Sequence, residues 1–396
     1  MSIDIAVVGA STAGLLVARE LALKGLRVAV YEARKHQEPA RRTLIVTPAL
    51  NRVLGHVSDQ VILHKIDVLR LCAGGECKNV RLQHPDFIVE RGQLTAWLQR
   101  QVEALGVEIH HNCRFVNFET RQAETLLRFR NGGDEFCERV TRGVVGADGV
   151  ASDVGRAAGI PRPPSVPILQ AEIDLPARWH SSTTAVWFDI EQTKFFFWLL
   201  PESERRGVVG LIGDANSRVR ELLNQFLATW EFVPGAYQGA RVALYDPRIK
   251  PWTRVGHLPV YLVGDSAGQV KVTTVGGTVT GFAGARAVAQ ALLENRSYCS
   301  CLRSVKRELD LHYWIRRQLD RLTGRDYVDL IRALNPAVLE FLGTHDRDSM
   351  APVLWRLPLL EPGLMRIGLR SLWRRSTNRE TFQSTRIDEA SEHPDV

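Results

Sequence analysis

The residues best suited to chemistry in this sequence begin with a glycine turn close to its start. Residues 9–14, GASTAG, follow the apolar run Ile3 to Val8 and lead into a helical pattern and then a strand that ends at Glu32. This order, with an acid about 20 residues past the turn, is the dinucleotide-binding fingerprint. The helix N-terminus directs its positive dipole end at a pyrophosphate, and Glu32 can accept hydrogen bonds from a ribose. A purely structural glycine turn is the alternative.

Two later segments also place an acid where an apolar strand ends. RGVVGADGVAS contains Asp148, and YLVGDSAGQVKVTTVGG contains Asp265 followed by a glycine-bearing loop and a long helical pattern. Asp265 can contact a ribityl chain from the end of its strand. Gly276 and Gly277 open a helix whose N-terminus can face the electron-rich edge of an isoalloxazine.

Together, GASTAG with Glu32, GADGVAS and GDSAG resemble the FAD signatures of a flavoprotein superfamily that contains aromatic hydroxylases of the para-hydroxybenzoate hydroxylase type, flavin-dependent halogenases and geranylgeranyl reductases. The resemblance covers roughly residues 3–330. It implies an α/β fold: a Rossmann-like FAD-binding domain with an inserted antiparallel β-sheet substrate domain and a C-terminal helical segment. It also implies the cofactor FAD.

The same resemblance implies individual cofactor contacts. Arg42 and Arg91 stand where the superfamily has flavin-contacting or phosphate-contacting arginines, with a surface position as the alternative, and Phe115 stands where the backbone meets adenine. Ser11 departs from the fingerprint, which has a glycine where the backbone approaches the pyrophosphate, but serine is small. The expected cofactor-binding residues are Gly9, Ser11, Thr12, Ala13, Gly14, Glu32, Arg42, Arg91, Phe115, Asp148, Gly149, Gly264, Asp265, Gly276, Gly277 and Thr278.

Within the superfamily, the loop after Asp265 is similar to that of the geranylgeranyl reductase family. The run GDSAGQVKVTTVGG is close to that family's GDAAGQVKPTTGGG, whereas hydroxylases usually have a histidine at the position of Gly268. Two departures stand out, Val272 for a proline and Val275 for a glycine. A β-branched residue does not easily adopt a positive φ, so we expect the loop geometry near the flavin to differ from the family's.

An aromatic run, KFFFWLLP, is the second feature shared with these reductases. Phe196, Trp198 and Pro201 fall at places comparable to the family's aromatic-x-Trp-x-Phe-Pro run and are the expected substrate contacts, walls of an apolar slot. Halogenases have a similar run. The alternative is that Phe195, Phe197 and their neighbours are core residues of a sheet, which strand alternation supports for half of them.

The resemblance implies an FAD-dependent oxidoreductase, in the first place a reductase of carbon–carbon double bonds in a polyprenyl or other long apolar substrate. Hydride would come from flavin N5 and electrons from NAD(P)H or a ferredoxin-like protein. Some members carry a cysteine soon after the second strand, but this chain has none between Glu32 and Cys72, and no catalytic residue is assigned. The alternatives are a monooxygenase or halogenase, for which Lys65 and Lys78 are unplaced candidate lysines, and a non-catalytic flavoprotein.

Bulk properties are those of an ordinary globular chain: 396 residues, 45% hydrophobic and 24% charged. The net charge of +7 comes without a nucleic-acid motif, so it suits an acidic redox partner or a basic solvated surface. The opening segment enters a strand at once, so we expect no secretory signal and a cytoplasmic location. The cysteines lack zinc-site spacing, and we expect them to be reduced and no metal to be bound.

The expected domains are an FAD-binding domain at 1–160 and 255–300, a substrate sheet at 161–254, a C-terminal helical region at 301–375 and a disordered tail at 376–396. The stretch VLWRLPLLEPGLMRIGLRSLWRR mixes Trp, Leu and Arg. Peripheral contact with a membrane surface is one interpretation of it, and ordinary packing, interrupted at Pro358 and Pro362, is the other.

Overall fold

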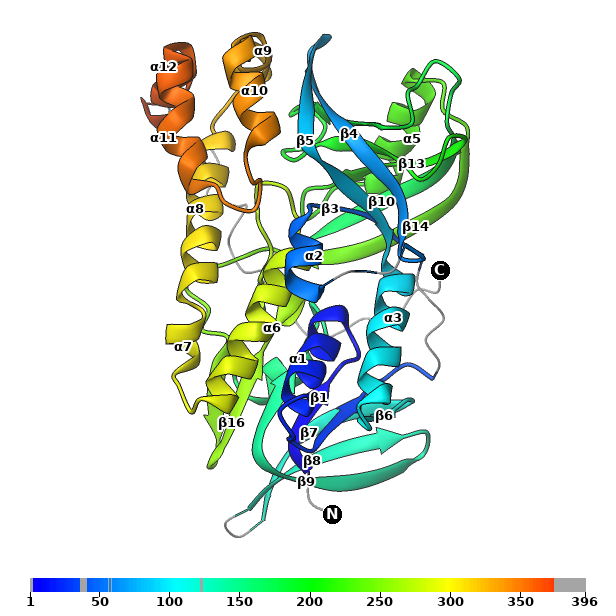
Figure 1. The fold of residues 1–396 in the computed structure, drawn as a ribbon, viewed down its shortest axis with the longest axis vertical. Helices are drawn as coiled ribbons and strands as arrows, with labels where there is room; N and C mark the ends of the chain where they lie inside the picture. The colour runs from blue at the N-terminus through cyan, green and yellow to red at the C-terminus, as the bar shows by residue number, and fades with distance from the viewer. Residues whose placement is uncertain (1–2, 36–40, 56, 58, 122–123, 374–396) are drawn as a thin grey trace.

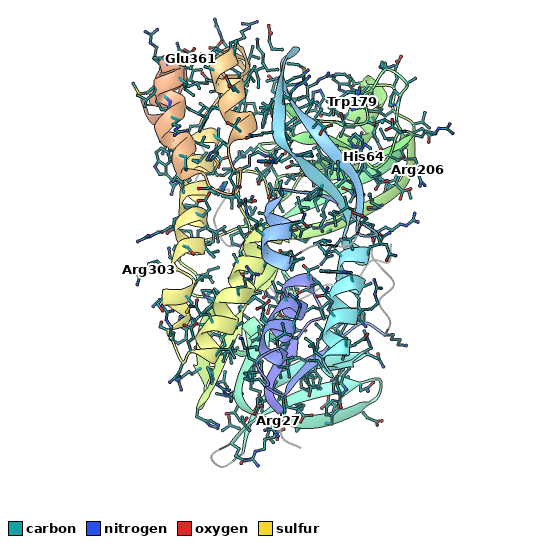
Figure 2. All side chains as sticks on the ribbon, viewed as in Figure 1. Arg27, His64, Trp179, Arg206, Arg303 and Glu361 are labelled. Carbon is teal, nitrogen blue, oxygen red and sulfur yellow. A yellow bond between two sulfur atoms is a disulfide. The ribbon has the colours of Figure 1, made fainter. Side chains whose placement is uncertain are left out.

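The computed structural model describes residues 3–35, 41–55, 57, 59–121 and 124–373, and their strands form two eight-stranded sheets toward opposite ends of the molecule (Figure 1). Side chains labelled in Figure 2 mark these ends, Arg27 on the first sheet's side and Trp179 on the second's. The expected tail at 376–396 lies outside the described residues. No helix among the described residues is long and apolar enough to cross a membrane.

The first sheet has a parallel centre in the order β16-β9-β1-β2-β6, with β15 antiparallel at one edge and an antiparallel meander β7-β8-β9. Strands β1 and β2 are almost wholly apolar because both faces of a parallel sheet are covered. The strands are β1 (Ile3–Val8), β2 (Val28–Tyr31), β6 (Glu108–His110), β7 (Cys113–Arg121), β8 (Glu124–Asn131), β9 (Asp134–Gly146), β15 (Trp252–Val255) and β16 (Leu258–Leu262).

Alternation along β1 shows what covers each face. Ile5 and Val7 belong to a buried cluster with helices α1 (Thr12–Ala22), α3 (Arg91–Ala104) and α6 (Thr278–Leu293), which lie side by side in Figure 1. Ala6 and Val8 belong to a second cluster with residues of the β7-β8-β9 meander. The first cluster continues into the second sheet, so the two sheets share a core.

The second sheet has the order β14-β10-β13-β12-β11-β4-β5-β3, and every pair is antiparallel except β11 with β4, which is parallel. One face packs on helix α5 (Val219–Thr229) through Phe197, whose ring stacks on Phe226 with centroids 4.3 Å apart. The strands are β3 (Thr43–Val46), β4 (Ile62–Ala73), β5 (Glu76–Glu90), β10 (Ser165–Asp174), β11 (Thr183–Phe188), β12 (Phe197–Pro201), β13 (Arg206–Ile212) and β14 (Pro234–Ala243).

Sheet membership differs from the expected domain bounds in one respect. The sequence analysis assigns residues 43–90 to the FAD-binding domain, but β3, β4 and β5 hydrogen-bond into the second sheet. Alternation identifies strands but not the sheet that they join, because that choice depends on pairing between β4 and β11, far apart in the chain.

The remaining helices lie mainly after residue 297 and stack along one side of the molecule, where α9 packs on the β4–β5 hairpin and α10 on β5 (Figure 1). Pro362 is the first residue of α12, as expected for a helix boundary, but α11 continues through Pro358. These helices are α2 (Ala49–Leu54), α4 (Asp153–Ala157), the 3₁₀ helix η1 (Gly264–Ala267), α7 (Tyr298–Cys301), α8 (Arg303–Leu319), α9 (Gly324–Arg332), α10 (Pro336–Thr344), α11 (Ala351–Leu360) and α12 (Pro362–Trp373).

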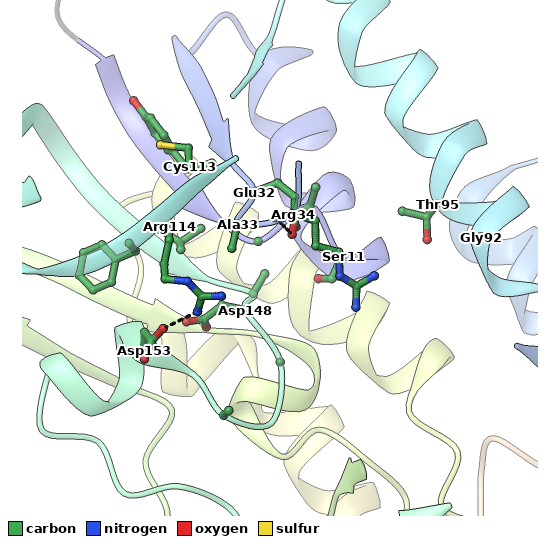
Figure 3. Close-up of a pocket in the computed structure, with 18 of the residues that line it drawn as sticks. Ser11, Glu32, Ala33, Arg34, Gly92, Thr95, Cys113, Arg114, Asp148 and Asp153 are labelled. Carbon is green, nitrogen blue, oxygen red and sulfur yellow. Dashed lines mark hydrogen bonds and ion pairs between the residues drawn. The ribbon is translucent and has the colours of Figure 1, made fainter. Parts of the chain in front are cut away.

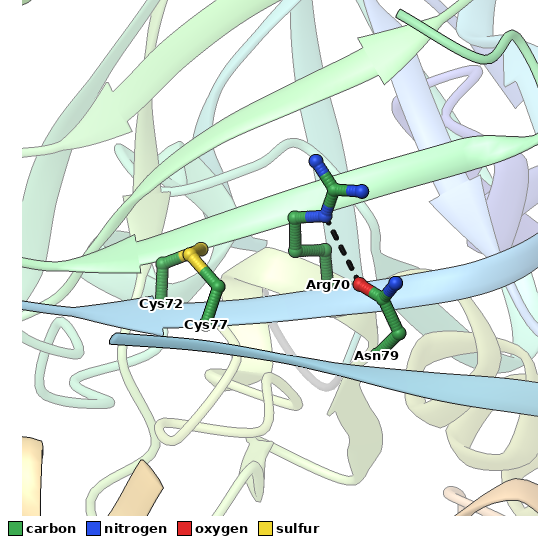
Figure 4. Close-up of a disulfide and its surroundings, with 4 residues drawn as sticks. All are labelled: Arg70, Cys72, Cys77 and Asn79. Atoms are coloured by element: carbon green, nitrogen blue, oxygen red, sulfur yellow. Dashed lines mark hydrogen bonds between the residues drawn. A yellow bond between two sulfur atoms is a disulfide. The ribbon is translucent and has the colours of Figure 1, made fainter. Parts of the chain in front are cut away.

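The expectation of reduced cysteines is wrong for one pair. Cys72 and Cys77 face each other across the β4–β5 hairpin and form a disulfide (Figure 4). The register of the hairpin brings the two side chains together, and that register is not visible in the spacing of the cysteines along the chain.

Candidate functional site

Two adjoining cavities, of about 370 and 340 Å³, open where β1 meets α1. They share Ser11, Arg91, Ala147 and Gly149, so they form one continuous site that runs from the end of β2 to the second sheet. Each is within the size range of small-molecule sites. An elongated ligand that occupied both would pass the N-terminus of α1.

The first cavity is lined by polar groups from the ends of the first sheet's strands (Figure 3). At the end of β2, the Glu32 carboxylate accepts hydrogen bonds from the backbone N–H of Ala10, at 2.8 Å, and of Arg34, at 3.0 Å. Phe115 lies in the same wall, and Arg114 pairs with Asp153 at 3.5 Å. Glu32 is therefore held against the glycine turn, where a ribose of a dinucleotide would lie.

The backbone conformation and close packing of the glycine turn explain why glycine occupies positions 9 and 14. Gly9 has φ 99°, and a Cβ there would lie 2.5 Å from the carbonyl oxygen of Ala147. At Gly14, a Cβ would lie 2.4 Å from the carbonyl oxygen of Gly9, so strand and helix pack too closely for a side chain. Ser11 departs from the fingerprint without disrupting the turn, because its Oγ caps α1 by accepting the Gly14 N–H at 3.2 Å.

The second signature organises the turn that leads into α4. Asp148 accepts hydrogen bonds from the Ser152 hydroxyl at 2.6 Å and from the Val154 N–H at 3.0 Å. Burial raises the pKa of Asp148, and these two donors oppose that rise. The carboxylate thus holds the turn whose Gly149 lines both cavities.

At the junction with the second cavity lie Arg42, Arg91 and Asp265. Burial, and then the neighbouring Arg91 guanidinium, lower the pKa of Arg42 to about 10. The pKa of Asp265 is raised by burial, against the opposing charges of the two arginines. Arg42 Nε is buried and, among the described residues, has no hydrogen-bond partner. A buried, unpaired guanidinium N–H calls for an acceptor on a ligand.

Glu90 joins the backbone of Arg42 to the start of α3, where Arg91 is the first residue, a role that sequence reasoning missed. Its carboxylate caps α3 by accepting the N–H groups of Gly92 at 2.9 Å and Gln93 at 2.7 Å, and it accepts the Arg42 N–H at 3.2 Å. The acid directly before the helical pattern RGQLTAWL was the available signal.

The loop 268–277 connects η1 to α6 and lines the second cavity. Gln269 fixes it at one end, because its Oε1 accepts the Gly264 N–H at 2.8 Å and its Nε2 donates to the Tyr298 hydroxyl at 3.0 Å. At the other end, the Lys271 N–H donates to the Gly276 carbonyl at 3.1 Å. Val275 has φ 51°, a left-handed backbone conformation that a β-branched residue rarely adopts. The chain accepts strain there of about 1–3 kcal/mol.

Apolar side chains of the second sheet form the far wall of this cavity. Phe196 and Trp198 line it, with ring centroids 6.2 Å apart, whereas Pro201 ends β12 outside the lining. Their neighbours in the wall are Leu69, Ile168, Val186, Leu200, Ile212 and Val242. Phe195 and Phe197 pack in the core instead. The wall suits a long apolar ligand beside the loop 268–277.

Charged residues that the sequence analysis did not select also line the second cavity. Lys271 pairs with Asp348 at 2.6 Å, Arg347 pairs with Asp86, and the Thr47 hydroxyl donates to Asp348. These residues come from β5, from the loop 268–277 and from the α10–α11 connection, so only the fold brings them together. Single charged residues at such separations give no sequence signal.

Taken together, the expected cofactor-binding residues line the two cavities, apart from Gly14, which packs behind the turn. A carboxylate at the ribose end, a helix N-terminus in the middle, and a buried unpaired guanidinium nitrogen at the junction fit the shape and charge of FAD.

Residues 2–296 match the family model described as FAD binding domain. Among curated proteins, the chain is 27% identical over 333 residues to digeranylgeranylglycerophospholipid reductase 2 of Methanopyrus kandleri, covering 76% of this chain and 81% of the relative. Among solved structures it resembles a geranylgeranyl bacteriochlorophyll reductase-like protein from Thermoplasma acidophilum, with TM-score 0.79 and 18% identity over 93% of this chain and 99% of the other. It also resembles a flavin-dependent brominase, with TM-score 0.64 and 16% identity over 90% and 98%. The expected family resemblance, fold class and cofactor are confirmed.

Proposed function

Because this chain belongs to the FAD binding domain family and is an FAD-dependent oxidoreductase, we propose that it reduces carbon–carbon double bonds of a polyprenyl or other long apolar substrate. The observation that carries this proposal is the apolar wall of Phe196 and Trp198 opposite the loop 268–277 in one cavity. When bound and reduced, FAD supplies a hydride equivalent to such a substrate. The name of the Methanopyrus kandleri relative supports a polyprenyl lipid as the substrate class.

In this proposal, each part of the site has its own task. The residues of the first cavity, led by Glu32, hold the adenosine end of FAD, and the N-terminus of α1 faces its pyrophosphate. Arg42, Arg91 and Asp265 contact the flavin end, and Gly276 and Gly277 place the N-terminus of α6 beside it. The Phe196–Trp198 wall holds the apolar chain and excludes water. Pro201 remains a predicted substrate contact.

The monooxygenase or halogenase alternative uses the same fold, as the brominase shows, and the fold does not decide the reaction. The lysines considered for halogenation, Lys65 and Lys78, are not among the residues that line the two cavities. Lys271 does line the second cavity, but its ammonium group pairs with Asp348. These observations favour the reductase.

The proposed reaction needs an electron donor and access to an apolar substrate. Electrons would come from NAD(P)H or from a ferredoxin-like protein, whose acidic surface would complement the net charge of +7. We place the protein in the cytoplasm, with peripheral contact to the membrane that holds its substrate. Leu359 on α11 is 81% exposed and Met365 on α12 is 51% exposed, and a membrane interface would accommodate such apolar side chains.

The test is turnover of purified FAD-loaded protein with a chemical reductant and a polyprenyl lipid, followed by mass spectrometry. A gain of two hydrogens for each reduced bond, in the absence of oxygen, supports the proposal. A substrate that gains oxygen or halogen, and only when oxygen is present, would establish the alternative instead.

A further inference from the structure

The second cavity contains one buried acid that no part of the proposed function yet uses. Asp86 lies on β5 and is only 1% exposed, yet it lines the same cavity as Phe196, Trp198 and Gly276. One of its oxygens, Oδ2, accepts from Arg347. The other, Oδ1, is buried and has no hydrogen-bond partner among the described residues. A carboxylate oxygen left without a partner in such a site is costly, whereas a protonated carboxyl group is tolerated.

A second acid nearby makes an informative contrast. Asp348 is fully engaged, because Lys271 pairs with one oxygen at 2.6 Å and the Thr47 hydroxyl donates to the other. Burial alone would raise the pKa of Asp348, but Lys271 and Thr47 hold it below its ordinary value. For Asp86, burial raises the pKa, and the charges of Arg347 and Lys271 do not overcome it. Of the two acids, Asp86 is the one whose pKa is raised and whose second oxygen is unpartnered among the described residues.

We propose that Asp86 is the catalytic acid that protonates the substrate double bond, and that Arg347 orients it. This inference rests on the proposed reductase function. One alkene carbon takes the Asp86 proton and the other takes a hydride equivalent, which reduced FAD supplies as the two-electron reductant. One π bond breaks and two C–H bonds form. Asp86 is left as a carboxylate and recovers its proton from solvent before the next turnover.

The hydroxyl group that lines this cavity from the chain after β3 is already engaged. The Thr47 hydroxyl donates to Asp348 rather than standing free in the cavity. Among the described residues, β5 and the α10–α11 connection contribute three ionisable side chains to the lining of the second cavity. They are Asp86, Arg347 and Asp348. Among these, Asp86 alone combines a free oxygen with a raised pKa.

The test uses the FAD-loaded protein carrying Asp86→Asn, which keeps an oxygen for Arg347 but has no proton to give. After anaerobic photoreduction, reoxidation of the flavin by a polyprenyl lipid should slow by about 10²–10⁴-fold, the usual contribution of a general acid. Reoxidation by dioxygen and the FAD content should stay unchanged. Asp86→Glu should restore part of the lost rate. Infrared spectroscopy of the resting protein should show a protonated-carboxyl band that Asp86→Asn removes.

Asp214→Asn is the matched control. Asp214 also has a buried oxygen without a partner among the described residues, and burial raises its pKa, but it does not line either cavity. This variant should reoxidise with the lipid at the wild-type rate. In the wild-type protein, the lipid-dependent rate should fall as the pH rises through the pKa of Asp86. The charged groups that face Asp86 there are Arg347, Asp348 and Lys271.

The outcomes separate this inference from the proposed function. If Asp86→Asn reacts with the lipid within threefold of wild type, or if the infrared band persists, Asp86 is not the acid although the reductase function stands. If wild-type flavin is not reoxidised by the lipid at all, the reductase function fails and the role of Asp86 fails with it. Should Asp86→Asn not fold, the infrared band and the Asp86→Glu rate decide the question: no band, or a rate equal to wild type at every pH, would overturn it.

Discussion

Replacing Arg42 by methionine should separate the stability of the protein from its affinity for FAD. In the absence of cofactor, Arg42 is a partly buried cation whose buried Nε has no partner among the described residues, and its pKa falls to about 10. At about 1.4 kcal/mol for each pH unit, this fall corresponds to a cost of roughly 3 kcal/mol for keeping the charge. Methionine has a similar length and no charge, so Arg42→Met should leave the cofactor-free protein as stable as wild type or up to about 3 kcal/mol more stable.

FAD binding should show the opposite effect. A charge-assisted hydrogen bond to the cofactor contributes about 1.5–3 kcal/mol, so its loss should weaken FAD binding by roughly 10-fold to 150-fold. Urea unfolding gives the free energy of unfolding of the cofactor-free protein, and flavin fluorescence titration gives its affinity for FAD. Arg100→Met, at an exposed position on α3, is the control and should change neither. Arg42→Met that destabilises the cofactor-free protein by more than 1 kcal/mol and binds FAD normally would refute this reasoning.

Three further changes test the other physical arguments. Val275→Gly should alter the free energy of unfolding by less than about 1 kcal/mol, because relief of about 1–3 kcal/mol of strain at φ 51° offsets the lost burial of about 1.5–3 kcal/mol. If urea unfolding shows a loss of stability of about 1.5–3 kcal/mol, Val275 is not strained. A hydrogen bond from the Arg248 side chain, opposed by burial, lowers the pKa of Asp246. That pair therefore stabilises the fold above the unfolded pKa of about 4 and stops doing so as the pH falls through the folded pKa. Asp246→Asn should cost about 0.5–1 kcal/mol at pH 7 and nothing at the acid end, whereas a cost independent of pH would contradict the pairing. Replacing Cys72 and Cys77 together by serine should cost at most about 2 kcal/mol, because the disulfide closes a short loop, and should leave FAD content unchanged. Loss of flavin would contradict the separation of this disulfide from the residues that line the two cavities.

Many residues that line the two cavities could be predicted from the sequence because they are local in the chain. Gly9, Ser11 and Glu32 belong to one βαβ unit, and Asp148 and Asp265 each sit where a strand ends. Backbone conformation and close packing dictate these residue types, so they leave a pattern of fixed spacing. The structure places them around two connected cavities, as that pattern implies.

The apolar wall of the second cavity could be predicted only in part. Phe196 and Trp198 were selected by their likeness to the family's aromatic run, and alternation indicated only that half of the run faces the core, because a strand shows opposite faces at successive residues. The pairing of β4 with β11 and the Cys72–Cys77 disulfide depend on register between separate segments, which composition and periodicity do not contain.

The charged residues Asp86, Arg347 and Asp348 of the second cavity were missed, although their neighbour Lys271 belongs to the run GDSAGQVKVTTVGG, and the reason is also physical. Asp86 and Arg347 are 261 residues apart, and neither belongs to a motif. An isolated acid in a strand is usually exposed, but Asp86 is buried on a strand that α10 packs against, and Arg347 of the α10–α11 connection pairs with it. At Val275 the residue type predicts a negative φ, but the surrounding loop imposes a positive one.

The most direct test of the central claim is the anaerobic half-reaction of the wild-type protein. Photoreduced, FAD-loaded protein is mixed with a polyprenyl lipid without oxygen, and flavin absorbance and lipid mass are followed together. The account predicts that the flavin is reoxidised while the lipid gains two hydrogens for each flavin oxidised. Flavin that stays reduced until oxygen is admitted, and a lipid that is then oxygenated or halogenated, would contradict it.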